Sequence, residues 1–142
     1  MAARALARRE LSSAEVAARL SRARVAPDAG ADVLTSLEEA GLVDDARAAR
    51  ARAAALAERG YGDAAIAARL EAAGIGEAHA SEAIEALEPE TPRARRLVAR
   101  ERDLARAARL LARRGFDPEV VEELFGALDS ADEHGLGWAP HT

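Results

Sequence analysis

The chain repeats itself, and this repeat constrains its fold more than any other feature. At an offset of 50 residues, Leu6–Leu20 (LARRELSSAEVAARL) overlies Leu56–Leu70 (LAERGYGDAAIAARL). At an offset of 55, the second copy overlies Leu111–Phe125 (LARRGFDPEVVEELF). The large apolar residues fall at matched positions in all three copies. The repeat therefore predicts a tandem array of similar units rather than one round core.

Each copy has the pattern of a helix, a tight turn that carries one large apolar residue, and a second helix. Apolar residues in that second helix are spaced at i and i+4, which places them on one face. Because these positions recur in every copy, we expect them to form the core of each unit. They are Leu11, Tyr61 and Phe116 in the turns, followed by Val16, Ile66 and Val121 and by Leu20, Leu70 and Phe125.

Helix-capping residues stand where the second helices should begin. Ser12 and Glu15 have the spacing of a capping box, and Asp117 precedes a proline at the first helical position. Gly62 or Asp63 would begin the second helix of the middle copy.

Third helices are expected only in the first two copies, over about 28–40 and 77–87, ended by Gly41 and Pro89. Residues 93–114 can form one long helix or two. The fold class that follows is all-α, with tandem three-helix repeats in an elongated right-handed-type helical array. The predicted divisions are 1–43, 44–90 and a less regular 91–128, followed by a disordered tail at 129–142, with docking of Trp138 as the lesser alternative.

Composition excludes several kinds of chemistry. Alanine accounts for 39 of the 142 residues, so little bulky apolar volume is available and a thin core is expected. All 20 basic residues are arginines, and without lysine there is no phosphate-loop lysine and no Schiff base. The absence of cysteine excludes disulfides and thiolate metal sites and fits the cytoplasm. No stretch approaches the roughly 18 apolar residues of a membrane span.

No catalytic or cofactor site is visible in the sequence. The three histidines, His79, His134 and His141, lack metal-ligand spacing and are interpreted as surface residues. Glycines near residues 60 and 74 follow no strand, so helix ends explain them better than a phosphate-binding loop. We therefore expect a protein that is not an enzyme and that needs neither metal nor cofactor.

Charge alternates along the chain, although the formal net charge is −5. Residues 1–24 hold six arginines against two glutamates, residues 46–59 hold four against one, and residues 93–114 hold nine against two acids. The segments between them are acidic. Three basic helices can line up as one arginine stripe that binds a partner. Alternatively, basic and acidic helices face each other in weak ion pairs that specify packing.

Arginines at turns and helix ends are the best candidates for partner contacts. A guanidinium group can bind a carboxylate or a phosphate through two parallel hydrogen bonds. Solvated helix-end arginines are the alternative interpretation. Tyr61 and Phe116 can likewise stack on a partner, but their repeat position favours the core. The candidate contact residues are Arg59, Arg69, Arg113, Arg114, Arg47 and Arg50.

Three motifs around the middle copy resemble the RecX family of RecA regulatory proteins. They are a Gly-Leu-hydrophobic-Asp-Asp step at Gly41–Asp45, an Arg-Gly-Tyr-Gly turn at Arg59–Gly62, and a Gly-hydrophobic pair at Gly74 and Ile75. The Arg-Arg-Gly-aromatic turn at Arg113–Phe116 resembles the third repeat of that family, and the likeness extends over about residues 3–128. The family usually has bulky residues after the Asp-Asp step, where this chain has alanines.

The resemblance implies a regulator that binds RecA filaments on single-stranded DNA and inhibits or modulates recombinase and ATPase activity. Such a protein acts in recombination, DNA repair and the SOS response, with weak direct DNA contact as a further option. Two other functions remain open on the residues alone. One is a helical protein that binds nucleic acid directly through the basic stripe, and the other is a non-catalytic helical scaffold.

Overall fold

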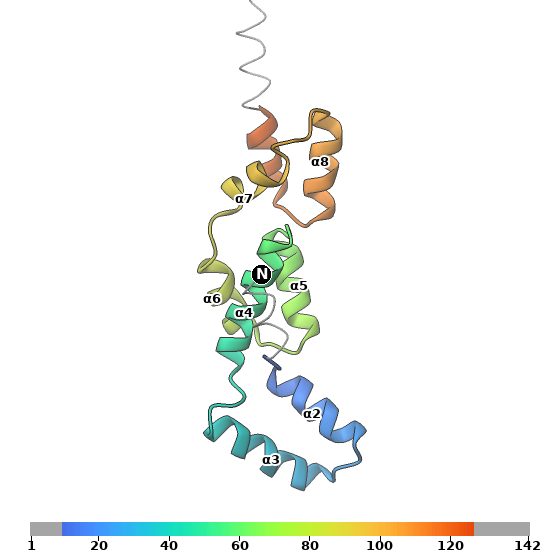
Figure 1. Cartoon of the computed structure of the whole chain (residues 1–142), viewed down its shortest axis with the longest axis vertical. Helices are drawn as coiled ribbons and strands as arrows, with labels where there is room; N and C mark the ends of the chain where they lie inside the picture. Colours follow the sequence, from blue (N-terminus) through green and yellow to red (C-terminus); the bar gives the residue numbers. More distant parts are fainter. Residues whose placement is uncertain (1–9, 127–142) are drawn as a thin grey trace, which may run out of the picture.

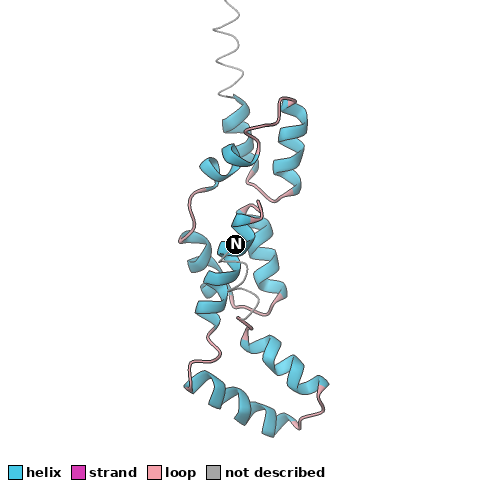
Figure 2. Cartoon of the chain, in the orientation of Figure 1, coloured by secondary structure: helices cyan, strands magenta, loops and turns pink. Residues whose placement is uncertain are grey.

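A computed structural model describes residues 10–126, and all regular secondary structure in that range is helical (Figures 1 and 2). This confirms the all-α prediction. The predicted tail at 129–142, including Trp138, lies outside the described residues. The helices are α2 (Ser13–Arg22), α3 (Pro27–Glu39), α4 (Asp45–Glu58), α5 (Asp63–Ala72), α6 (Glu77–Glu85), α7 (Glu90–Leu97) and α8 (Leu104–Arg113), and residues 118–126 are also helical.

The helices form three groups that follow one another along the long axis of the molecule (Figure 1). The first group is α2 and α3, the middle group is α4, α5 and α6, and the third group is α7, α8 and residues 118–126. The predicted divisions at 43/44 and 90/91 stay predictions, and the second of them falls after the first residue of α7. The elongated shape agrees with an array rather than a single round core.

The middle group has the larger core. Helix α4 contacts both α5 and α6, and α5 also contacts α6. Three alanines on α4, Ala48, Ala49 and Ala53, are fully buried, so the backbones of the helices can approach closely where a bulkier residue would hold them apart. The buried members of this core are Ala48, Ala49, Ala53, Leu56, Ile66, Leu70, Ile75, Ala80 and Ala83.

The third group has a smaller core of Ala94, Leu111 and Phe116. The structure decides that residues 93–114 form two helices rather than one, because α7 ends at Leu97 and α8 begins at Leu104. Asp103 caps the second of them, since its side chain accepts hydrogen bonds from the N–H groups of Ala105 and Arg106. This cap fixes the start of a helix that carries Arg113 in its last turn.

The nine residues expected in the core differ in their burial. Val16, Ile66, Leu70 and Phe116 are buried. The others are partly buried, and three of them, Tyr61, Val121 and Phe125, pack against the edges of the two cores. The remaining two are Leu11 and Leu20, which belong to the first group, where Val16 is the buried apolar residue of α2.

Candidate partner-binding surface

Three arginines surround the ring of Tyr61. The guanidinium carbons of Arg59, Arg69 and Arg114 lie 5.3, 4.3 and 5.0 Å from the ring centroid. All three distances are within the range of a cation–π interaction, which is about 6 Å. We call these four residues the Tyr61 cluster. Half of the six arginines that the sequence singled out are thus brought to one aromatic ring.

Two equivalent turns of the repeat create this cluster by meeting at the joint between the middle and third groups. Arg59 and Arg114 each cap the end of a helix, α4 and α8, and each is followed by a glycine in the left-handed region. The Arg114 Nη1 donates to the Arg59 carbonyl oxygen at 2.8 Å, and the Gly62 N–H donates to the Arg114 carbonyl oxygen at 2.7 Å. Arg69 reaches the same ring from α5.

The close approach of these turns depends on glycine at position 62. An ideal Cβ there would lie 2.5 Å from the carbonyl carbon of Gly115 and from the nitrogen of Phe116. Both are backbone atoms, so they cannot move aside as a flexible side chain would. Any side chain at position 62 must therefore separate the two turns.

A buried carboxylate and a buried guanidinium hold the same joint. Glu90, 8% exposed, accepts from the Asp63 N–H at 2.6 Å and from the Asp117 N–H at 3.0 Å. It thereby bridges the starts of α5 and of the helix at 118–126. Arg93, 7% exposed, donates to the carbonyl oxygens of Tyr61 and Glu88 and pairs with the Asp63 carboxylate. Both buried charges are thus satisfied, as burial requires.

The Tyr61 cluster carries uncompensated positive charge. Within residues 10–126, no ion pair joins Arg59, Arg69 or Arg114 to a carboxylate. Arg59 and Arg69 are exposed, and Arg114 and Tyr61 are partly buried. The C-terminal ends of α4 and α8 offset part of this charge, because a helix dipole is negative there. The remaining charge makes the cluster a candidate site for an anionic partner.

The other three candidate arginines lie elsewhere. Arg47 is paired with Glu10 at 2.9 Å. Arg50 is exposed on α4 near Asp44, whose carboxyl pKa is held below its ordinary value mainly by a hydrogen bond from the Arg47 N–H, with the charges of Arg47 and Arg50 adding to it. Arg113 is exposed on α8 and lines a shallow depression that Arg106 and Arg109 also line.

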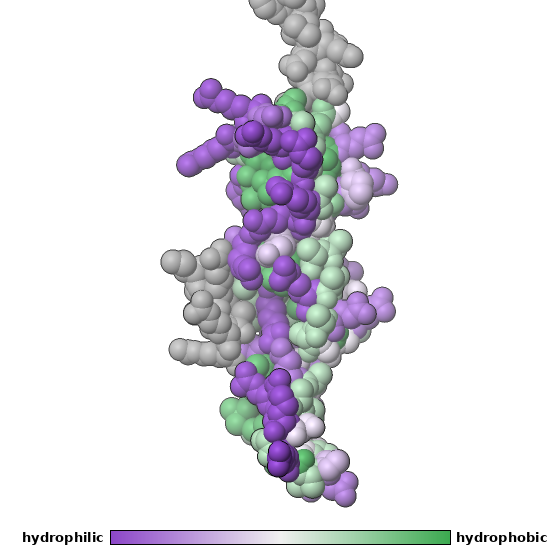
Figure 3. Space-filling model, turned by 90° about the vertical axis from the view of Figure 1, so that its right-hand side faces the viewer, coloured by the Kyte–Doolittle hydropathy of each residue, from purple (hydrophilic) through white to green (hydrophobic). Residues whose placement is uncertain are grey.

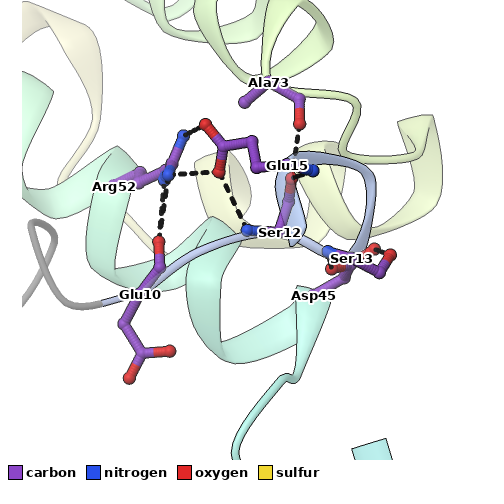
Figure 4. Close-up of polar contacts among 7 residues, drawn as sticks. All are labelled: Glu10, Ser12, Ser13, Glu15, Asp45, Arg52 and Ala73. Atoms are coloured by element: carbon purple, nitrogen blue, oxygen red, sulfur yellow. Dashed lines mark hydrogen bonds and ion pairs between the residues drawn. The ribbon is translucent and has the colours of Figure 1, made fainter. Parts of the chain in front are cut away.

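The joint between the first and middle groups is also polar (Figure 4). Ser12 and Glu15 form the predicted capping box, and the fully buried Ser12 hydroxyl donates to the Ala73 carbonyl oxygen at 2.6 Å. Arg52 pairs with Glu15 at 2.5 Å and donates to the Glu10 carbonyl oxygen. Partial burial disfavours the Glu15 carboxylate, but hydrogen bonds from the Ser12 N–H and from Arg52, together with the Arg52 charge, outweigh it and lower the pKa of Glu15.

The ion pairs of the basic helices support the packing interpretation of their charge. Arg47 and Arg52 on α4 and Arg93 on α7 form ion pairs between segments 30 to 37 residues apart in the sequence, which is a packing role. The contact role stays a prediction, and the Tyr61 cluster is its candidate. Arg52, Arg93 and Glu90 were not among the residues predicted from the sequence, because no local spacing signals pairs that distant.

On the face that includes α5 and α8, hydrophilic side chains surround an apolar patch in the third group (Figure 3). Within the described range, no group of histidines and acids could hold a metal ion, and His79 is exposed. His134 and His141 lie outside that range. None of the described helices has the length and apolar character needed to cross a membrane.

The fold and the joints define a class of protein: an elongated all-helical array of short helical units, docked through polar joints and carrying an exposed arginine cluster. Among solved structures, the chain is similar to RecX from Lactobacillus salivarius, with a TM-score of 0.73 and 19% sequence identity. The match covers 90% of this chain and 92% of that one. The chain therefore has a RecX-like fold. No protein-family model matches it, and no curated protein matches it at the sequence level.

Proposed function

We propose that this chain is a non-catalytic regulator that binds RecA filaments on single-stranded DNA and inhibits or modulates the recombinase. The observation that carries the proposal is the likeness of fold to RecX over 90% of the chain. The order of the Arg-Gly-aromatic turns at Arg59–Gly62 and Arg113–Phe116 supports it independently. The proposed role belongs to recombination, DNA repair and the SOS response in the cytoplasm.

The shape and the charge of the molecule suit this role. An elongated array offers a long surface that can lie along the groove of a filament (Figure 1). The Tyr61 cluster supplies exposed cationic side chains at the joint of two groups. Exposed charges of this kind raise the encounter rate and make binding dependent on salt. Regulation that weakens as salt rises is the expected behaviour.

A RecA ATPase assay on single-stranded DNA tests the proposal directly. Added protein should lower the rate of ATP hydrolysis at concentrations comparable to that of RecA. The control is the same titration against an ATPase that does not form filaments, whose rate should stay constant. An unchanged RecA rate, together with no binding of RecA filaments by sedimentation, would remove the basis of the proposal.

The same preparation distinguishes the two rival functions. Binding of naked single-stranded DNA as tightly as of RecA filaments, with a steep salt dependence, would favour a direct nucleic-acid binder. Binding of neither would favour a scaffold. The ion pairs of Arg47, Arg52 and Arg93 count against the first rival, because they interrupt the stripe that it needs.

A further inference from the structure

We propose that the Tyr61 cluster is a binding site for carboxylate side chains of an acidic protein segment. The cluster presents three guanidinium groups around one aromatic ring, and none of them is ion-paired within the described range. A guanidinium group binds a carboxylate through two parallel hydrogen bonds. The inference deepens the proposed function, on which its biological meaning rests, by naming the chemistry of the partner at this site.

The layout of charge favours carboxylates over a nucleic-acid backbone. A single strand carries phosphates at regular intervals, and proteins follow it with an extended basic groove and several stacking aromatic residues. Here the cationic site consists of three guanidinium groups around a single aromatic ring. Neighbouring arginines are paired internally: Arg93 with Asp63, and Arg96 with Glu88. Two or three carboxylates on a short segment place their charge only where the cluster lies.

The site is complete only while the middle and third groups are docked. Arg59 and Arg69 belong to the middle group, whereas Arg114 belongs to the third and reaches Tyr61 through its bond to the Arg59 carbonyl oxygen. Gly62 and Glu90 hold this joint closed. Because a ligand that contacts both groups stabilises their docked arrangement, binding and docking are thermodynamically linked.

The chain has a single tyrosine, so a label in that ring reports on the site itself. Protein carrying ¹³C-tyrosine is titrated with a hexaglutamate peptide and followed by NMR. The Tyr61 ring signals should shift in a saturable way that weakens with salt. Hexaglutamine should leave them unchanged, and an oligothymidylate of equal charge should bind more weakly.

Matched variants separate the cluster from general charge. Arg59→Gln, Arg69→Gln and Arg114→Gln together should weaken peptide binding by roughly ten-fold or more. The control removes the same charge at three exposed arginines outside the cluster, and it should stay within about two-fold; its changes are Arg19→Gln, Arg22→Gln and Arg109→Gln. Arg69→Gln alone is the second test, because this exposed side chain makes no hydrogen bond within residues 10–126 and its loss should leave the fold intact.

Several outcomes would overturn the inference. They are the absence of any shift with hexaglutamate, an equal loss in the control triple variant, and oligothymidylate binding as tight as that of the peptide. Gly62→Ala opens the joint without removing charge, and unaltered binding by this variant would refute the dependence on docking. RecA inhibition without peptide binding would refute this inference alone. Peptide binding without any effect on RecA would refute only the proposed function.

Discussion

Gly62→Ala is the sharpest test of how the middle and third groups dock. The added methyl would lie 2.5 Å from two backbone atoms of the opposing turn, so the turns must separate by about an ångström to reach ordinary contact distance. Separation stretches two hydrogen bonds between the groups, from the Gly62 N–H to the Arg114 carbonyl oxygen and from the Ala64 N–H to that of Gly115. Gly62 has a φ of −85°, so the alanine brings no strain of its own.

The expected loss of stability has two parts. Two weakened hydrogen bonds are worth about 1 kcal/mol each. Overpacking against backbone that cannot yield adds about 1 to 3 kcal/mol. The two parts overlap, because opening the joint relieves the clash at the expense of the hydrogen bonds. We therefore expect the free energy of unfolding to fall by about 3 kcal/mol. This is less than the hydrogen-bond loss added to the upper value for overpacking.

Gly76→Ala is the matched control. Gly76 is also the N-cap of a helix, also has extended backbone and also lacks a side-chain cap, but its added methyl would meet no atom within 4 Å. Urea unfolding followed by circular dichroism gives the midpoint and slope for both variants. A lower slope for Gly62→Ala would show the third group unfolding separately, as repeat arrays allow. Equal midpoints and slopes for the two variants would refute the close approach of the turns.

Three further predictions concern single side chains. Glu90→Ala leaves two partly buried N–H groups without their acceptor and should lower the free energy of unfolding by about 3 kcal/mol in urea titrations; a loss below about 0.5 kcal/mol would contradict the bridging role. The pKa of Glu15 is below its ordinary value of 4.5 in the folded chain, so its stabilisation is present above that pH and is lost as pH falls through the folded pKa. Glu15→Gln should therefore lower the urea midpoint at neutral pH but not in strong acid, and a gap that is independent of pH would refute the pairing with Arg52. Tyr61→Ala should lower the free energy of unfolding by about 2 kcal/mol and Tyr61→Phe by less than about 0.5 kcal/mol, measured by thermal unfolding, because the ring rather than the hydroxyl makes the contacts. Equal losses for the two variants would assign the contacts to the hydroxyl instead.

Short stretches of the sequence determine the helix caps, the turns and the apolar faces of the helices. The capping box of Ser12 and Glu15 spans one helical turn, and the glycine after α3 follows from the need for a left-handed residue at a helix end. Apolar spacing and the two offsets predicted an elongated helical array, because each helix must bury one face and each copy offers the same face to its neighbour. Caps, turns and apolar faces depend on residues a few positions apart, and their recurrence in each copy of the repeat makes them recognisable in the sequence.

Only the tertiary structure decided which charges remain free. Arg47 and Arg59 look alike in the sequence, yet one pairs with Glu10 and the other stands over Tyr61 without a carboxylate partner in the described range. Tyr61 packs against the edge of the middle core and also lies against three arginines, so its ring is only partly buried. The physical reason is distance along the chain. The partners at the joints are 27 to 61 residues apart, and only the docking of whole helices determines which of many similar arginines and acids come within reach of one another.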